Sequence, residues 1–93
     1  MLNPIVLETP ATCGDLATAT STVKVGGLAV SKVDIDSAGD TIVGPGSSPF
    51  GVFVEGVSMS LTGDSIIGHG DGAHSNPTFA SPLPNAMSVR IGP

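Results

Sequence analysis

The sequence predicts a small all-β domain in which three similar units surround one axis, and three observations lead to this prediction. The chain has 93 residues, of which 13 are Gly and 8 are Pro, so long helices are unfavourable. Short segments alternate apolar and polar residues with the period of a β-strand. These segments recur along the chain, which has room for one domain, placed at residues 1–93.

The clearest repeat is a pair of segments 29 residues apart, TVKVGGLAVSKV at 22–33 and GVFVEGVSMSLT at 51–62. A Gly turn separates two alternating stretches in each copy, which is typical of two short paired strands. A shorter third copy, SVRIG at 88–92, places Val89 and Ile91 in the same roles. The sequence therefore predicts three hairpins, of which the last is truncated.

A two-stranded hairpin is marginally stable alone, so three of them must bury their apolar faces against one another. This requirement predicts pseudo-threefold symmetry. The segments 28–33 and 57–62 are apolar and distant from the loops, and we expect them to form the base of the body. Met59 and Met87 lie in apolar stretches and are predicted to belong to the core.

Three loops separate the hairpins and contain the residues that could bind a metal. If the loops are equivalent, Cys13, Pro45 and His69 take comparable places at one end of the axis, and a single metal there does not need three identical ligands. The predicted loops are PATCGDL at 10–16, GDTIVGPGSS at 39–48 and GDSIIGHGDGAHSNP at 63–77.

Cys13, His69 and His74 are the candidate metal ligands. One thiolate and two imidazoles suit tetrahedral zinc, whereas an iron site would normally contain more histidine. Asp71 or Asp15, a water or a backbone oxygen would supply the fourth ligand. In the alternative interpretation, the two histidines are exposed turn residues and Cys13 is a small apolar side chain beneath the first loop.

The remaining acidic residues have structural and functional interpretations. Asp40 and Asp64 each follow Gly and precede a strand-like stretch. They are either carboxylates of a hydrolase or turn residues that accept backbone hydrogen bonds, and their repetition favours turns. The run DIDSAGD at 34–40 lacks the ligand spacing of an EF-hand and is expected to be a solvated turn.

Composition argues against several classes of protein. Three basic residues against eight acidic ones provide no cationic stripe, and the chain has no Trp or Tyr for base stacking, so we expect no nucleic-acid partner. The start of the chain lacks the features of a secretory signal, which predicts synthesis in the cytosol without a signal peptide. The single cysteine excludes an internal disulfide.

The chain also resembles a known family. The pattern of STVKVGGLAVSKVD and VFVEGVSMSLTGDSIIGHG, followed by HSNP and SVRIG, is similar to the PAAR-repeat (proline-alanine-alanine-arginine) spike-tip proteins. These proteins occur in type VI secretion systems, contractile phage tails and phage-tail-like injection systems. The resemblance covers nearly the whole chain. The family motif is degenerate at 29–32 and 58–61, which favours a divergent phage-tail or phage-tail-like version.

The resemblance implies a cone-shaped domain with a structural Zn²⁺ near its apex, bound by Cys13, His69 and His74. It further implies a tip that caps and sharpens a trimeric β-helical spike, one tip per trimer, at the baseplate of a virion tail or the distal end of an injection-system spike. Contact with the target cell envelope would be transient. We expect no small-molecule substrate, no appended toxin and no enzymatic activity.

Two alternatives to the spike tip remain at this stage. One is a small metal-dependent hydrolase in which Asp40 or Asp64 assists a metal-bound water. The other is a metal-free module that caps a different trimeric assembly.

Overall fold

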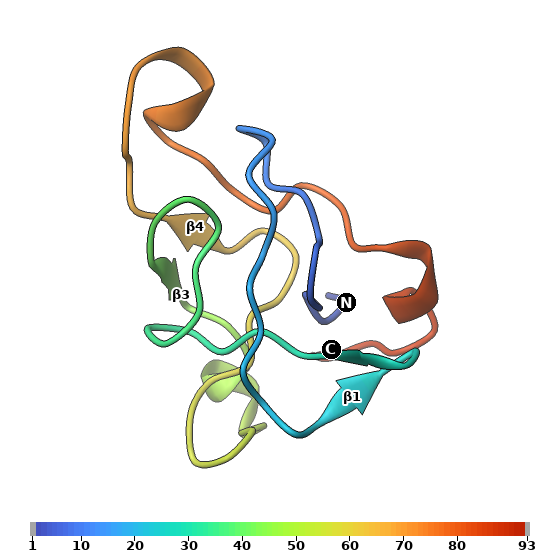
Figure 1. Cartoon of the computed structure of the whole chain (residues 1–93). Coiled ribbons are helices and arrows are strands. Elements are labelled where there is room, and N and C mark those ends of the chain that lie inside the picture. Colours follow the sequence, from blue (N-terminus) through green and yellow to red (C-terminus); the bar gives the residue numbers. More distant parts are fainter. Residues whose placement is uncertain (1, 93) are drawn as a thin grey trace.

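The computed structural model describes residues 2–92 and has no long helix in that range, as predicted (Figure 1). Short strands and single-turn 3-10 helices alternate with isolated β-bridges. None of the helices in this range is long and apolar enough to span a bilayer. In chain order the elements are β1 (Lys24–Val25), β2 (Leu28–Ala29), β3 (Ile42–Gly44), η1 (Ser48–Phe50), β4 (Ser65–Ile66), η2 (Gly72–His74) and η3 (Pro84–Ala86).

Strands β1 and β2 form the first predicted hairpin. Val25 pairs with Leu28, and the φ angles of Gly26 and Gly27 between them are 60° and 87°. Positive φ at both central positions is the mark of a type I′ turn, whose twist matches that of two paired strands. Glycine adopts this conformation at the lowest cost, which explains the Gly-Gly sequence.

The second predicted hairpin has the same register 29 residues later. The N–H of Val54 donates to the carbonyl of Val57 at 2.8 Å, and the reverse bond measures 3.0 Å. The turn residues Glu55 and Gly56 have φ angles of 52° and 83°. The repeat in the sequence is therefore a repeat in the structure.

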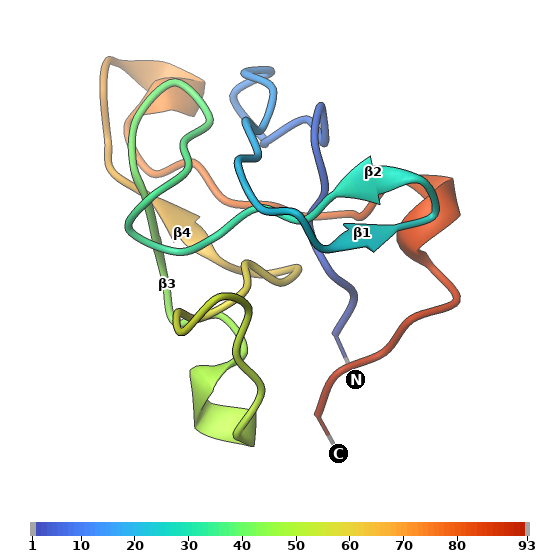
Figure 2. The same ribbon diagram turned by 60° about the horizontal axis from the view of Figure 1, so that its bottom comes forward.

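The third predicted copy pairs with the beginning of the chain (Figures 1 and 2). Leu2 and Ile91 exchange backbone hydrogen bonds of 2.9 and 2.7 Å, so Ile91 takes the place that Val25 and Val54 have in the other hairpins. The role predicted for Ile91 is confirmed. The prediction of a truncated hairpin is wrong, because segments from opposite ends of the chain complete it.

A closed ring of three strands lies at the centre of the fold. The N–H of Ile5 donates to the carbonyl of Ser60 at 2.9 Å. Ser60 donates to Ser31, and Ser31 donates back to Ile5, each at 2.8 Å. The bridges Val6 to Val30, Lys32 to Met59 and Pro4 to Leu61 repeat the same pattern. We call the three segments 3–7, 29–33 and 58–62 the ring strands.

The same pattern of backbone hydrogen bonds thus occurs three times in the ring, but the segments that form it are not all the predicted ones. The segments predicted as the base, 28–33 and 57–62, contribute two ring strands. The third is the N-terminal segment, to which sequence analysis gave no role. It was missed because the repeat that contains it is split between the two chain ends, so no single stretch of sequence displays it.

Each ring strand leaves the ring through a residue with positive φ, namely Glu8 (70°), Asp34 (69°) and Gly63 (90°). Three loops follow, at 8–17, 34–42 and 63–79, and we call them the first, second and third loop. A backbone hydrogen bond joins the ends of each: Glu8 N–H to Ala17 O at 2.8 Å, Asp34 N–H to Ile42 O at 2.9 Å, and Gly63 N–H to Phe79 O at 2.6 Å.

One side chain near the start of each loop caps the preceding ring strand. The hydrogen bonds given below confirm that Asp64 is a turn residue. The turn at 34–40 was predicted to be solvated, but its Asp36 is only 1% exposed. The ring-strand amide of Val6 donates to Thr9 Oγ1 at 3.2 Å, that of Lys32 to Asp36 Oδ2 at 2.8 Å, and that of Leu61 to Asp64 Oδ2 at 2.9 Å.

Two apolar clusters divide the interior between a loop side and a hairpin side. Met59 is buried on the hairpin side, as predicted, but Met87 is 52% exposed just after η3 and does not belong to the core. The loop-side cluster contains Ile5, Ala11, Ala17, Val33, Ala38, Ile42, Ile66 and Phe79. The hairpin-side cluster contains Val6, Val30, Val54, Met59, Leu61 and Ala86.

The similar segments GDTIVGPG at 39–46 and GDSIIGHG at 63–70 are not equivalent by the pseudo-threefold pattern. They contain β3 and β4, which pair with each other antiparallel, with Ile42 opposite Ile66. Both isoleucines are buried in the loop-side cluster. The two segments are therefore similar because each forms a strand with one face on that cluster. The predicted second loop at 39–48 is wrong.

An ion pair connects the ring strand 29–33 with the turn of the second hairpin. Lys32 is 8% exposed, and its Nζ lies 2.9 Å from Glu55 Oε1. The hydroxyl and the N–H of Thr22 donate to Glu55 Oε2 at 2.9 and 3.2 Å. The Lys32 ammonium first, and then Thr22, lower the pKa of Glu55 to about 2. Glu55 thus occupies a positive-φ turn position where it can hold a buried lysine.

We expect Glu55→Gln to destabilise the protein at neutral pH and to matter less in acid. The folded-state pKa lies below the ordinary value of 4.5, so the carboxylate stabilises the fold above pH 4.5 and this contribution is lost as the pH falls toward 2. Urea unfolding between pH 7 and pH 2 measures the difference in free energy of unfolding between the variant and the wild type. This difference should decrease as the pH falls. Glu8→Gln, at another positive-φ position, is the matched control. A difference that stays constant with pH would contradict the assignment.

Candidate metal centre

The tips of the first and third loops bring four potential ligands together. The first loop supplies Cys13 and Asp15, and the third supplies His69 and His74. One ligand atom from each residue lies within 4.8 Å of all the others. Cys13, His69 and His74 were predicted to converge, and the structure places them in one cluster.

The ligand atoms have spacings close to those of a four-coordinate site. Donor atoms around a tetrahedral zinc ion lie about 3.3–3.8 Å apart, given its usual bond lengths. Asp15 Oδ2 lies 3.4 Å from Cys13 Sγ, 2.7 Å from His69 Nε2 and 3.5 Å from His74 Nδ1. His69 Nε2 lies 3.1 Å from His74 Nδ1 and 4.0 Å from Cys13 Sγ. The donor set of one thiolate, one carboxylate and two imidazoles fits Zn²⁺.

A backbone contact orients the His69 ring. His69 Nδ1 lies 2.9 Å from the carbonyl oxygen of Ile67, and because a carbonyl only accepts, Nδ1 carries the hydrogen. The lone pair of the neutral ring is then on Nε2, which faces the cluster. The N–H of His69 also donates to the carbonyl of His74 at 2.9 Å, which fixes the spacing of the two histidines. This second layer of contacts is typical of metal-binding histidines.

The second loop covers the cluster without contributing a ligand. Its tip residue Gly39 has φ of 82°, and a Cβ at this position would meet the Asp15 carboxylate and His69 Nε2. Glycine is therefore required both by the backbone and by the close approach to the cluster. All three loops meet at the cluster, as predicted, but Gly39 and not Pro45 represents the second loop.

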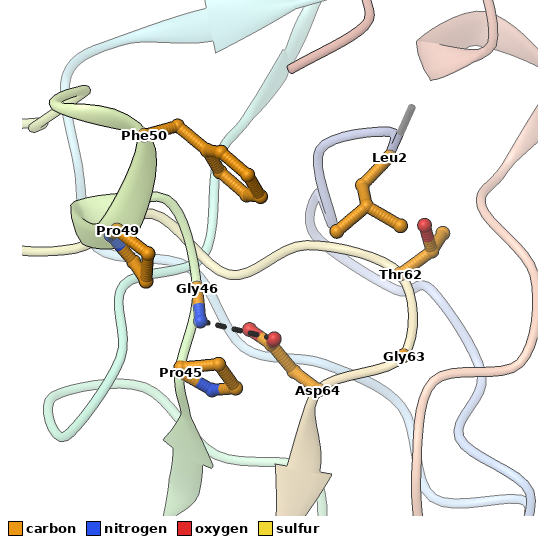
Figure 3. A pocket seen from close by; sticks show the side chains of 8 residues that line it. All are labelled: Leu2, Pro45, Gly46, Pro49, Phe50, Thr62, Gly63 and Asp64. Atoms are coloured by element: carbon orange, nitrogen blue, oxygen red, sulfur yellow. Dashed lines mark hydrogen bonds between the residues drawn. The ribbon is translucent and has the colours of Figure 1, made fainter. Parts of the chain in front are cut away.

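Pro45 lies instead beside an apolar pocket of about 360 Å³, away from the cluster (Figure 3). Leu2 and Phe50 line the same pocket, and so does Asp64, whose Oδ1 accepts the N–H of Gly46 at 3.0 Å. The prediction that Pro45 replaces a ligand is wrong because the residue follows β3 rather than a loop tip.

The structure also sorts the acidic candidates. Asp15 is the carboxylate of the cluster. Asp71 precedes η2, is exposed, and is not part of the cluster, although it was one of the two predicted options. Asp40 Oδ1 accepts the N–H of Thr41 at 2.7 Å, which confirms its role in a turn. The sequence offered no preference between Asp15 and Asp71, because each lies two residues after a predicted ligand, Cys13 and His69 respectively.

Electrostatic contacts within the cluster shift two pKa values in opposite directions. The Ile67 carbonyl first, and then the Asp15 carboxylate, raise the pKa of His69 above its ordinary value of 6.5. Hydrogen bonds from His69 and then from the Cys13 thiol lower the pKa of Asp15 below 3.8. At neutral pH the metal-free cluster therefore contains a carboxylate close to a histidine that readily takes up a proton. A bound cation would replace that proton.

Comparisons with known proteins do not assign the chain, because no family model, curated protein or solved structure matches it.

We expect Asp15→Asn to weaken zinc binding roughly 10- to 100-fold, because it removes the only carboxylate of the cluster. Competition with a chromophoric zinc chelator measures the affinity. Asp71→Asn is the matched control, since Asp71 is exposed in the adjacent loop and makes no side-chain cap. Equal affinities for the two variants would show that Asp15 is not the fourth ligand.

Proposed function

We propose that this protein is a metal-stapled structural tip that caps a trimeric β-helical spike in a contractile injection machine, such as a phage baseplate. The observation that carries the proposal is the closed ring of three strands, in which one chain reproduces a threefold arrangement of backbone hydrogen bonds. A monomer of this kind can match the end of a true trimer and cover strand edges that would otherwise invite association.

The position of the cluster supports a staple. Cys13 and Asp15 belong to the first loop and His69 and His74 to the third, so one ion would join segments 54 residues or more apart in the chain. Structural zinc contributes on the order of 10 kcal/mol to the folding of small domains. The named strands within residues 2–92 are at most three residues long, so a further connection between the loop tips would make this end of the molecule more rigid.

The two sides of the molecule suit the two tasks of a tip. The three loops converge on the cluster and would form the narrow leading end of a cone, whereas the three hairpins, from which the chain enters the ring strands, would form its base. Figure 2 shows the loop tips along the top, the β1–β2 hairpin at the right, and the second hairpin below, with the segments that lead to the two chain ends at the lower right. The base would rest on the spike and the loop end would contact the target envelope.

The contacts of the aspartates favour this role over a hydrolase. If all four residues bound one ion, their atoms would fill a four-coordinate site and leave no position for a reactive water. The Asp64 carboxylate accepts hydrogen bonds from Gly46, Leu61 and Ser60 on the ring, so it is committed to structure. The other alternative is a metal-free module that caps a different trimeric assembly, and it differs from the proposal in the partner and in the absence of a bound metal.

We expect about one zinc per chain in freshly purified protein, and a large fall in melting temperature when a strong chelator removes it. Elemental analysis and thermal unfolding measure these quantities. Cys13→Ser should lower both the zinc content and the melting temperature, whereas Thr12→Ser, at an exposed neighbouring position, should change neither. Metal-free protein of unchanged stability, with a silent Cys13→Ser, would support the metal-free module instead.

Native mass spectrometry with a trimeric β-helical spike protein tests the capping role itself. The proposal predicts one chain bound per three spike chains. Three chains bound per trimer would contradict it, because the single chain would then not supply the threefold match.

A further inference from the structure

The charges of this protein are divided between its two sides. Of its eight acidic residues, seven lie in the three loops: Glu8, Asp15, Asp34, Asp36, Asp40, Asp64 and Asp71. The eighth, Glu55, is paired with Lys32. The other two basic residues, Lys24 and Arg90, are exposed and form no ion pair within residues 2–92. The hairpin side therefore has unpaired cations on a chain of net charge −5.

Lys24 and Arg90 occupy equivalent places in two of the three hairpins. Lys24 precedes Val25, which pairs with Leu28, and Arg90 precedes Ile91, which pairs with Leu2. The same place in the second hairpin belongs to Phe53, which precedes Val54 and is 58% exposed. The pseudo-threefold pattern thus carries two cations and one aromatic ring, and we call these three residues the docking ring.

The backbone around the docking ring is open to a partner. Val52 and Val54, on either side of Phe53, both pack in the hairpin-side cluster, so the Phe53 side chain points to the opposite face. Val25 and Ile91, which follow Lys24 and Arg90, also pack against this cluster, whereas Val23 before Lys24 is exposed. Hydrogen bonds alternate along an antiparallel pair, which directs the N–H and C=O of the docking-ring residue away from the hairpin partner. Phe53 and Arg90 accordingly make no backbone hydrogen bond within residues 2–92.

We propose that the docking ring seats this chain on the threefold end of a trimeric protein whose rim presents one carboxylate per chain. This inference rests on the proposed tip function and adds the surface and the chemistry of the partner. Two of the three identical carboxylates pair with Lys24 and Arg90, and the third partner chain packs its apolar stem against Phe53. Complementary charge would orient the tip, with the acidic loop side directed away from the acidic rim.

A rigid protein partner fits these residues better than an anionic membrane. Each basic residue near an anionic bilayer is worth about 1 kcal/mol, so two of them do not retain a chain of net charge −5 at a lipid surface. Three equivalent positions in a pseudo-threefold pattern, in contrast, match the symmetry of a trimer whatever the net charge of the chain.

The test uses two trimeric β-helical spike proteins that differ at one rim position, with Glu in one and Gln in the other. Binding of the zinc-loaded full chain to each trimer is measured by calorimetry in low salt. We expect the wild type to bind the Glu trimer about tenfold more tightly than the Gln trimer. The double variant Lys24→Gln/Arg90→Gln should remove that preference, and Phe53→Ala should weaken binding to both trimers.

A charge-matched control separates the docking ring from net charge. Asn76→Glu/Ala80→Glu also lowers the net charge by two, at exposed positions in or next to the third loop, and should retain the preference for the Glu trimer. Melting temperatures confirm that all variants fold. Equal binding of the wild type to both trimers would overturn this inference and leave the tip function intact. Binding to neither trimer would overturn both. Binding of the wild type, but not the double variant, to phosphatidylserine vesicles would replace the trimer with a membrane.

Discussion

The backbone hydrogen bonds that join Ile5, Ser31 and Ser60 close a triangle, and the other elements of the fold are attached to it. Each ring strand shares its first half with one neighbour and its second half with the other, so no ring strand is complete without both. The chain enters every ring strand from a hairpin and leaves it into a loop. This order places all hairpins in one group and all loops in another, and it explains how loops distant in sequence converge on one cluster.

The ring also explains which residues are free to differ among the three units. Positions that the backbone constrains keep their character, as in the positive φ shared by Glu8, Asp34 and Gly63. Positions at the loop tips diverge: the first and third loops supply the four potential metal ligands, and the second supplies Gly39, which leaves room for them. In the proposed function, the differences among the three units would matter on both sides, as a metal site at the loops and as the docking ring at the hairpins.

Sequence analysis identified the all-β class, the two full hairpins with their tight Gly turns, and Cys13, His69 and His74, three of the four residues of the cluster. Local signals carried these predictions, since turn glycines and period-2 alternation reflect interactions between near neighbours. What it missed depended on contacts between distant segments. The N-terminal ring strand has no local repeat to reveal it, and Gly39 looks like any turn glycine until the first and third loops surround it. Pro45 was misplaced because 39–46 and 63–70 resemble each other as paired strands, not as equivalent loops.

Native-state hydrogen exchange of the ring amides tests the closed ring most directly. The N–H groups of Ile5, Ser31 and Ser60 are the donors of the triangle, so opening any one bond requires the ring to open. We predict that these three amides are among the most protected in the zinc-loaded protein. All three should exchange at the same rate, which is set by global unfolding. Fast exchange at Ile5 beside slow exchange at Ser31 and Ser60 would contradict this prediction, because the N-terminal segment would then lie on a two-stranded core instead of completing a ring of three.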